Sequence, residues 1–358
     1  MGAQVMVMAG GTGGHVFPAL AVAEELHSRG VAVCWLGTPD SFEARLVPRH
    51  GFPLETIPVR GLRGKGAAGW LAAPFRIGRA MLQARRVLLR RKPQLVLGMG
   101  GFAAGPGGMM ARMLGIPLVV HEQNAIPGLT NQWLSRIATR VLEAFPGSFP
   151  PATRAQVTGN PVRPEIAGLP APEQRFAGRR GALRLLVLGG SLGARALNQA
   201  VPAALALLAP DQRPRVRHQA GREKAEATRA CYRAAGVEAE VTPFLDDMAA
   251  AYGWADLVIC RAGALTVAEL AAAGVGAVLV PYPYAVDDHQ TRNARYLTRA
   301  GAARLLAETE LDAAGLAALI AGTGGRGALL EMARAARDLG LPEATSRVAE
   351  VCQELIPV

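Results

Sequence analysis

Three glycine-rich segments of this 358-residue chain each follow a run of apolar residues, at the point where a strand would turn into a helix. They read GGTGGH at residues 10–15, GMGGFAAGPGG at 98–108 and GGSLGA at 189–194. A helix start offers free backbone N–H groups and a partial positive charge, so turns of this kind attract anions. One such loop can be no more than a tight turn, but three in equivalent places predict a ligand that carries phosphate.

Two common nucleotide-binding motifs are absent from these segments. Neither GGTGGH nor GGSLGA has the GxGxxG spacing, and the second apolar run ends in Leu36-Gly37 without an acidic residue that could bind a ribose. The P-loop pattern is absent as well. The sequence therefore disfavours nicotinamide chemistry and P-loop hydrolysis.

Strand-like runs rich in valine, leucine and isoleucine alternate with helix-like stretches along the chain. Before the proline-rich and charged interruption at 159–181, these runs are 4–9, 31–36, 95–99, 117–121 and 140–144. After it they are 183–188, 216–219, 239–241, 257–260 and 275–280. Continuous apolar strands between helices are typical of parallel sheets covered on both faces. The expected fold is α/β, with two doubly wound, Rossmann-like parallel-sheet domains facing a deep cleft, and sites at the carboxyl ends of the strands.

The composition limits the class of protein. Half of the residues are apolar, but no run of about 18 suggests a membrane span, and the N-terminus lacks the pattern of a secretory signal. The four cysteines (34, 231, 260 and 352) are scattered, which indicates a reducing compartment and neither a zinc site nor a disulfide framework. We expect a soluble cytoplasmic protein.

The positive charge is concentrated in one segment. The chain carries a net charge of +11, and ten basic residues but no acidic one lie between Arg60 and Lys92. A block of one sign predicts an anionic partner, either nucleic acid or an anionic surface.

Seven motifs in register resemble one enzyme family. They are MAGGTGGHVFPALAVAEEL, GLRGKG, VLGMGGFAAGPGG, HEQNAIPGLTN, GNPVR, GGSLGARALN and CRAGALTVAELAAAG. Together they are similar to the undecaprenyldiphospho-muramoylpentapeptide β-N-acetylglucosaminyltransferases, the cell-wall enzymes that form lipid II. The likeness runs from about residue 4 to about residue 340. It implies a glycosyltransferase-B fold, with an acceptor and membrane domain at 1–160, a UDP-GlcNAc domain at 161–340, and a final helix within 341–358 that packs back on the first domain.

The resemblance implies transfer of GlcNAc from UDP-GlcNAc to the 4-hydroxyl of the MurNAc of lipid I, with inversion, in peptidoglycan synthesis. A UDP-GlcNAc 2-epimerase of the same fold is the alternative; it would share the glycine loops but need no lipid acceptor. A nucleic-acid-binding regulator would explain the charge, but it would leave the three loops without a role, and no RNA- or DNA-binding motif is present.

The donor-site residues are also implied by the resemblance. Glu269 is expected to accept hydrogen bonds from the ribose hydroxyls, for which a carboxylate has enough acceptors. Without the motif, Glu269 would be taken for a solvated helix residue, and Arg163 would fit an interdomain salt bridge as well as a diphosphate contact. The other implied donor contacts are Thr12, Gly13, Gly14, Asn124, Arg163, Ser191, Leu245, Ala264, Leu265, Thr266, Val267, Ala268 and Gln290.

The reaction needs one base that works near neutral pH. His15, at the edge of the first glycine loop, is the candidate that fits, with Glu122 as the alternative base. His15 could instead cap the loop or bind acceptor phosphate. The glycines around it are expected to clear space for a sugar and a lipid-linked diphosphate. No carboxylate cluster has metal-ligand spacing, so no cofactor is expected to be obligatory and the reaction is expected to be independent of metal.

A helix over residues 74–91 would place apolar and basic strips side by side, an arrangement that suits an anionic bilayer surface. The expected membrane patch consists of Trp70, Leu71, Phe75, Arg76, Arg79, Leu82, Arg86, Leu89 and Arg90. The expected location is therefore the cytoplasmic face of the bacterial inner membrane, as a peripheral protein. The family likeness implies a role in cell shape and the cell cycle, and it adds partners among the proteins of cell-wall synthesis or cell division. No nucleic-acid partner is expected, because no RNA- or DNA-binding motif is present.

Overall fold

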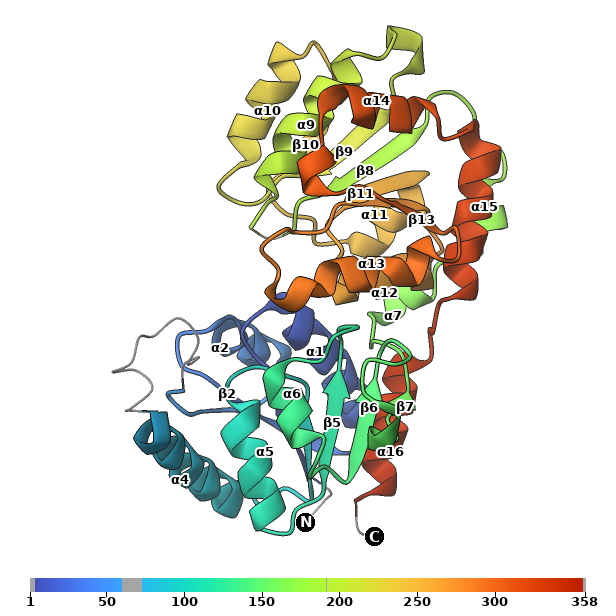
Figure 1. The fold of residues 1–358 in the computed structure, drawn as a ribbon. Helices are drawn as coiled ribbons and strands as arrows, with labels where there is room; N and C mark the ends of the chain where they lie inside the picture. Colours follow the sequence, from blue (N-terminus) through green and yellow to red (C-terminus); the bar gives the residue numbers. More distant parts are fainter. Residues whose placement is uncertain (1–3, 60–72, 191, 357–358) are drawn as a thin grey trace. The chain divides into compact units, whose positions relative to one another are not determined.

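A computed structural model describes residues 4–59, 73–190 and 192–356 of the chain. These residues form two compact units. Unit 1 comprises Met1–Arg163 and Glu343–Val358, and unit 2 comprises Pro164–Pro342 (Figure 1). The chain thus leaves unit 1 three residues after the expected boundary at 160 and returns to it at Glu343, so the final helix belongs to unit 1.

Unit 1 is built on a seven-stranded sheet in which every strand pair is parallel. The strand order is β3-β2-β1-β4-β5-β6-β7. The strands are β1 (Gln4–Met8), β2 (Ala32–Gly37), β3 (Leu54–Thr56), β4 (Leu95–Gly98), β5 (Leu118–Glu122), β6 (Arg140–Glu143) and β7 (Gln156–Val157). The helices are α1 (Gly13–Ser28), α2 (Phe42–Leu46), α4 (Ala73–Arg91), α5 (Ala104–Met113), α6 (Leu129–Leu134) and α16 (Ala344–Glu354).

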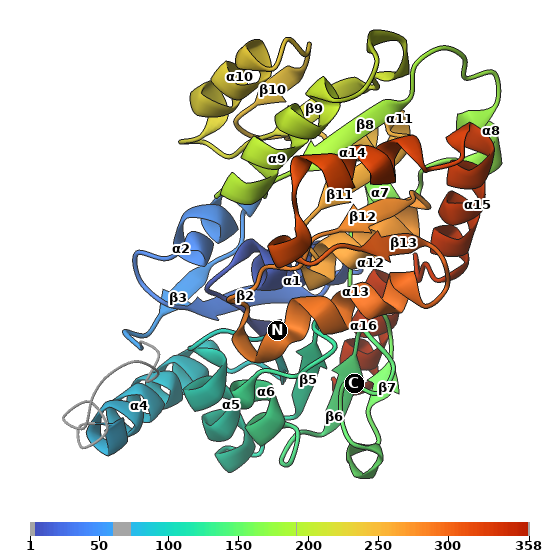
Figure 2. The ribbon, with the colours of Figure 1, turned by 45° about the horizontal axis from the view of Figure 1, so that its top comes forward.

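The alternation of side chains along β1 explains the two layers of helices in unit 1. Val5 and Val7 pack with α1 and α16 on one face of the sheet, while Met6 and Met8 pack with α4, α5 and α6 on the other. Figure 2 shows these helices around the strands of unit 1. All four side chains are 0% exposed. A strand that is buried on both faces reads as a continuous apolar run, which is why the sequence predicts it well.

Unit 2 repeats this plan with six parallel strands in the order β10-β9-β8-β11-β12-β13. The strands are β8 (Arg184–Leu188), β9 (Arg215–Gln219), β10 (Glu240–Thr242), β11 (Leu257–Cys260), β12 (Ala277–Leu279) and β13 (Ala303–Leu305). The helices are α7 (Pro164–Ala167), α8 (Pro172–Phe176), α9 (Arg195–Ala206), α10 (Ala225–Ala234), α11 (Met248–Trp254), α12 (Ala264–Ala273), α13 (His289–Thr298), α14 (Ala313–Ala321) and α15 (Gly325–Asp338).

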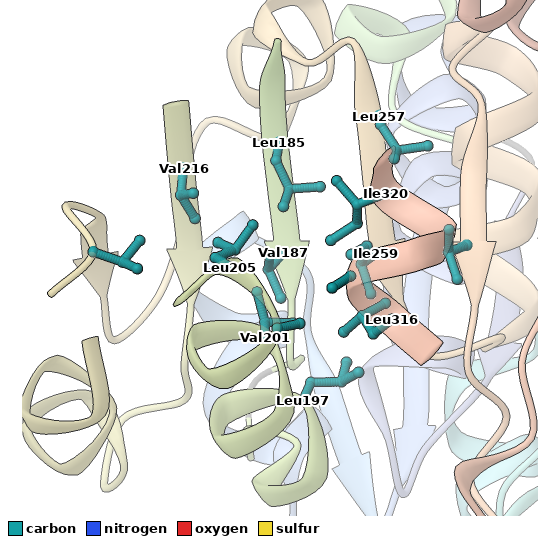
Figure 3. Packing of buried hydrophobic residues seen from close by; sticks show 14 of the residues in the cluster. Leu185, Val187, Leu197, Val201, Leu205, Val216, Leu257, Ile259, Leu316 and Ile320 are labelled. Atoms are coloured by element: carbon teal, nitrogen blue, oxygen red, sulfur yellow. The ribbon is translucent and has the colours of Figure 1, made fainter. Parts of the chain in front are cut away.

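The core of unit 2 lies between its sheet and the helices α9 and α14. Figure 3 shows Leu185 and Val187 of β8 among side chains from both helices, including Val201 and Leu316. The expected class of two doubly wound parallel-sheet domains is therefore confirmed. The sequence predicts the second glycine segment after the third strand of the first domain. In the structure it follows β4, the fourth strand of unit 1, because the short edge strand β3 precedes β4 in the chain.

In the part of the chain that the structure describes, no single helix has the length and hydropathy needed to cross a membrane. Only α14 and α15 taken together meet these criteria, and that pair is bent by 93°.

Candidate functional site

The first glycine segment, residues 10–15 (loop 1), connects β1 to α1. Gly11 has a φ of +91°, a conformation that favours glycine, and Thr12 is the N-cap of α1. The carbonyl of Thr12 accepts hydrogen bonds from His15 N and Val16 N, both at 3.1 Å. The His15 imidazole is half-buried, and its Nδ1 lies 3.4 Å from Thr12 Oγ1.

Two side chains that the sequence analysis did not single out hold loop 1 in place. The indole Nε1 of the buried Trp35 donates to the carbonyl of Ala9 at 2.9 Å. The carboxylate of Glu43, 0% exposed, accepts from Gly11 N at 3.0 Å through Oε2, and from Thr38 N at 3.0 Å and Thr38 Oγ1 at 2.7 Å through Oε1. Burial by itself would raise the pKa of the Glu43 carboxyl, but the hydrogen bonds from Gly11 and Thr38 outweigh it and hold the pKa below its ordinary value.

A second glycine segment lies directly against loop 1. Gly100 and Gly101, which follow β4, both have positive φ, at +98° and +92°. A Cβ on Gly101 would come within 2.7 Å of Gly10 N, and a Cβ on Gly100 would come within 2.7 Å of His15 Cδ2. Segment 98–108 (loop 2) is therefore glycine-rich at this point because it packs on loop 1 and on the His15 ring.

The glycines of loop 1 serve several purposes, which corrects the expectation that they all clear space for a ligand. A Cβ on Gly10 would come within 2.5 Å of Glu43 Oε1, and one on Gly13 within 3.1 Å of the Phe17 ring. Within loop 1, only Gly11 and Gly14 have open space where a Cβ would lie. Nothing lies within 4 Å of a Cβ on Gly11, and the nearest atom to a Cβ on Gly14 is Thr12 Oγ1 at 3.7 Å.

Glu122 ends β5 and is almost completely engaged in local contacts. It is 1% exposed, and Oε1 accepts from both nitrogens of Asn124, at 2.9 and 3.2 Å. Its Oε2 accepts from Gly128 N at 3.1 Å and from Asn131 Nδ2 at 2.9 Å. These contacts make Glu122 the anchor of segment 122–128 and disfavour it as the alternative base, because a base must reach the acceptor hydroxyl. The same contacts fix the side chain of Asn124.

His121 is a buried structural residue. Its Nε2 lies 2.9 Å from the carbonyl of Gly159, which can only accept, so Nε2 carries the proton and Nδ1 accepts from Gln123 Nε2 at 3.1 Å. Burial lowers the pKa of His121 to about 4. The imidazole therefore stays neutral and ties β5 to the segment after β7.

In unit 2, Glu269 lies on α12, whose N-cap is Gly263. Glu269 is 4% exposed, and its Oε2 accepts a hydrogen bond from the hydroxyl of the fully buried Tyr252 at 3.1 Å. A solvated helix position is therefore excluded for Glu269. The preceding predicted residues form the first turns of α12 and are buried or half-buried: Ala264, Leu265, Thr266, Val267 and Ala268.

The third glycine segment, residues 189–194 (loop 3), follows β8. Lys224 Nζ donates to the carbonyls of Leu192 at 2.6 Å and Gly193 at 2.9 Å. Lys224 comes from the segment after β9, and a Cβ on Gly221 of that segment would come within 2.5 Å of Gly193 N. Ser191 lies outside the described residues.

The remaining predicted donor contacts lie near the ends of other elements. Leu245 is half-buried and follows β10, next to Phe244, whose ring centroid lies 5.7 Å from the guanidinium carbon of Arg222. Gln290, at the start of α13, accepts from Tyr282 N at 2.9 Å. Arg163, the last residue of the first segment of unit 1, has its guanidinium carbon 6.0 Å from the Phe17 ring centroid.

The basic helix α4 is amphipathic, with Ala84 and Leu88 in the core. Its predicted apolar patch residues are exposed, at 84% for Phe75, 60% for Leu82 and 46% for Leu89. The arginines Arg76, Arg79, Arg86 and Arg90 are exposed as well, but Arg90 forms an ion pair with Glu55. Trp70 and Leu71 lie outside the described residues.

Within each unit, the structure gathers the predicted site residues at the carboxyl ends of parallel strands. In unit 1 they follow β1, β5 and β7, and in unit 2 those that the structure describes follow β10, β11 and β12. This is the edge at which open α/β sheets bind ligands. Among the described residues, no group of three or more His, Cys, Asp and Glu side chains could hold a metal ion.

Two parallel-sheet units, each with a glycine-rich loop after its first strand, define a two-domain α/β enzyme of the glycosyltransferase-B class. The model of the glycosyltransferase family 28 N-terminal domain matches residues 5–143, and that of the family 28 C-terminal domain matches residues 184–348. The chain belongs to glycosyltransferase family 28.

Individual relatives agree with this assignment over the full length. A relative from Nitrosococcus oceani is 56% identical over 356 residues, covering 99% of both chains, and is named UDP-N-acetylglucosamine–N-acetylmuramyl-(pentapeptide) pyrophosphoryl-undecaprenol N-acetylglucosamine transferase. The crystal structure of MurG from Acinetobacter baumannii is 44% identical, with a TM-score of 0.86, and the match covers 98% of this chain and 99% of that one.

A putative UDP-N-acetylglucosamine 2-epimerase from Listeria monocytogenes shares the fold alone. It is 14% identical, with a TM-score of 0.64 and coverage of 97% of this chain and 95% of that one.

Proposed function

We propose that this chain transfers GlcNAc from UDP-GlcNAc to the 4-hydroxyl of the MurNAc of lipid I and so forms lipid II. The observation that carries the proposal is the 56% identity over 99% of both chains to a transferase named for this reaction. The epimerase alternative has only a likeness of fold in its support.

The donor binds mainly to unit 2 in this proposal. The buried carboxylate of Glu269, fixed by the Tyr252 hydroxyl, accepts hydrogen bonds from the ribose. The N-terminus of α12 and loop 3 contact the diphosphate, where the helix dipole and the Lys224 ammonium offset the charge of the leaving UDP. Backbone at Leu245 reads the base, and Gln290 contacts the sugar.

Unit 1 supplies the base. The acceptor 4-oxygen forms a bond to C1 of GlcNAc as the bond from C1 to the phosphate oxygen breaks, and UDP leaves with the electron pair. The acceptor proton passes to His15, because histidine is the side chain whose ordinary pKa lies closest to neutral pH. One in-line step of this kind inverts the configuration at C1. Thr12, Gly14 and Asn124 contact the donor sugar, and Arg163 the diphosphate.

We further propose that no metal ion is required, because in the proposed complex the dipole of α12 and the Lys224 ammonium offset the charge of the leaving diphosphate. Transfer measured with and without EDTA tests this directly. Equal rates are expected, and loss of activity that Mg²⁺ restores would contradict it.

A product assay tests the proposed function. Labelled UDP-GlcNAc is incubated with a soluble, short-chain lipid I analogue, and the products are separated. A new GlcNAc–MurNAc disaccharide on the analogue is expected. Conversion of UDP-GlcNAc to UDP-ManNAc without acceptor would identify an epimerase instead.

We propose that α4 brings the enzyme to the anionic inner surface of the cell membrane. The exposed Phe75, Leu82 and Leu89 offer apolar contact. Each arginine near such a surface contributes about 1 kcal/mol, so several on one helix give weak, reversible binding. Because Arg90 is paired with Glu55, its share is expected to be the smallest.

Vesicle sedimentation tests the membrane proposal. Changing Arg76, Arg79, Arg86 and Arg90 to glutamate should abolish binding to phosphatidylglycerol-containing vesicles while sparing activity on the soluble analogue. Arg233→Glu, an exposed change on α10 of unit 2, is the control. Normal vesicle binding by the quadruple variant would show that α4 is not the anchor.

A further inference from the structure

Glu43 is a buried carboxylate with no role in the donor contacts or in the proton transfer described above. Its position is set within its own turn. Ser41 Oγ donates to the carbonyl of Thr38 at 2.7 Å and accepts from Ala44 N at 3.1 Å, and Thr38 donates twice to Glu43 Oε1. The turn therefore fixes the carboxylate independently of loop 1.

The strand ends around Glu43 are shaped to admit this carboxylate. Gly10 follows β1 and Gly37 ends β2, the neighbouring strand. A Cβ on Gly10 would come within 2.5 Å of Glu43 Oε1, and a Cβ on Gly37 within 2.8 Å of Glu43 Cγ. An ionised carboxylate is costly to bury unless it is hydrogen-bonded, and here Gly11 N and Thr38 provide the bonds.

Loop 2 confines loop 1 from another direction. Gly101 packs so closely on Gly10 that a Cβ would not fit between the two backbones, and Gly100 lies against the His15 ring. A change in the Gly10–Gly11 peptide is therefore transmitted through Thr12, the N-cap of α1, to the first turn of that helix, where His15 lies. A displacement of about 1 Å at a reacting group can cost about 100-fold in rate.

We propose that Glu43 is a positioning residue for His15: its carboxylate holds Gly11 N–H and, together with loop 2, fixes loop 1 in the one conformation that presents the imidazole to the acceptor hydroxyl. The inference rests on the proposed function and deepens it. It also assigns Gly11 N–H to an internal anion, so this amide does not bind a phosphate of either substrate.

The test combines kinetics with a readout that needs no turnover. Glu43→Gln keeps the shape of the side chain but places an NH₂ donor opposite another donor. In this variant kcat on the soluble analogue should fall about 10- to 100-fold, while the KM for UDP-GlcNAc changes less than about twofold. In a His15→Ala background, Glu43→Gln should cost almost nothing further. The ring resonances of His15 in NMR spectra, assigned by their loss in His15→Ala, should shift.

Two further variants keep the test decisive. Thr38→Val removes one hydrogen bond to the carboxylate and, if Glu43→Gln does not fold, should give the same pattern with a smaller loss of kcat. Glu354→Gln, an exposed change on α16 of the same unit, should behave as the parent chain. An equal loss with and without His15, or unchanged kcat and unchanged His15 resonances, would overturn the inference.

The failure of the proposed function would look different. A parent chain that transfers no GlcNAc would refute the function. A shift of the His15 resonances in Glu43→Gln would still support the positioning contact in that case, and unchanged resonances would overturn it.

Discussion

Loop 1 and loop 3 occupy equivalent places in the two units, yet the side chains that hold them carry opposite charges. Each loop follows the first strand of its unit, and each is held by a residue from the segment after the second strand. In unit 1 that residue is Glu43, which accepts from a loop N–H. In unit 2 it is Lys224, which donates to two loop carbonyls.

The difference shows that a glycine-rich turn does not by itself define a phosphate site. The charge that holds the turn decides which ligand it favours. A buried carboxylate at loop 1 repels an anion from Gly11, whereas an ammonium at loop 3 attracts one. The three glycine segments are similar in sequence, but from these contacts we expect the nucleotide diphosphate to bind at loop 3, while loop 1 holds His15.

The largest expected effect is on the chemical step at loop 1. His15→Ala should lower kcat on the soluble analogue about 10²- to 10⁴-fold, the usual contribution of a positioned base. Calorimetry should find the affinity for UDP-GlcNAc almost unchanged. A rate close to that of the parent chain would make His15 a structural residue.

A smaller effect is expected on the donor side of the comparison. Glu269→Ala should weaken UDP-GlcNAc binding about 10- to 100-fold, because hydrogen bonds to a charged group contribute about 1.5–3 kcal/mol. Tyr252→Phe, which keeps the ring and removes only the hydroxyl that holds Glu269, should weaken it less. Unchanged affinity in Glu269→Ala would remove this carboxylate from the donor site.

The charge at loop 3 should have a modest effect. Lys224→Met should weaken UDP binding about three- to fivefold at low salt, and less at high salt, because a half-buried ammonium is partly screened. Arg233→Met, an exposed change on the adjoining α10, is the matched control. If Lys224→Met binds UDP as the parent chain does at low salt, the assignment of charge to loop 3 is wrong.

The smallest expected effect concerns acid stability, in which the two units should behave alike. Burial lowers the pKa of His121 in unit 1 to about 4 and that of His218 in unit 2 to about 3. Unfolded histidine titrates near pH 6.5. The folded chain thus binds fewer protons than the unfolded chain, so this contribution to stability is complete above about pH 6.5 and is lost as the pH falls toward the folded values.

Replacement of one buried histidine checks this pH dependence. His218→Gln should reduce the proton uptake on unfolding by about one proton between pH 4 and 6. Chemical unfolding of the parent chain and of the variant across this pH range gives the proton uptake as the slope of the free energy of unfolding against pH. Equal slopes in the two chains would contradict the buried, neutral state of His218.

The central strands were predictable because they are buried on both faces. β11 has the predicted limits, and β1 and β8 differ from the prediction by one residue at one end. The missed strands β3, β7 and β13 are two or three residues long and lie at sheet edges, where one neighbour is enough to complete the pairing. Such short strands leave too few residues for a periodic pattern.

The side chains that hold the site were harder to predict than the motif residues. Glu43 and Lys224 act on loops about 30 positions earlier in the chain, through contacts that only the order of the strands creates. Tyr252 and Trp35 appear in the sequence as ordinary aromatic residues. The one usable signal for Glu43 was the pair of glycines beside it: Gly10 comes two positions after β1, and Gly37 ends the adjacent strand β2, six positions before the acid.

Titration with UDP, followed through the amide signals of the two loops, tests most directly which loop binds the diphosphate. In ¹H–¹⁵N spectra, the signals of Gly190 and Gly193 in loop 3 should shift with saturation. The signal of Gly11, whose N–H is bonded to Glu43, should stay in place. A saturable shift of Gly11 as large as those of loop 3 would contradict the assignment of the diphosphate to the loop held by Lys224.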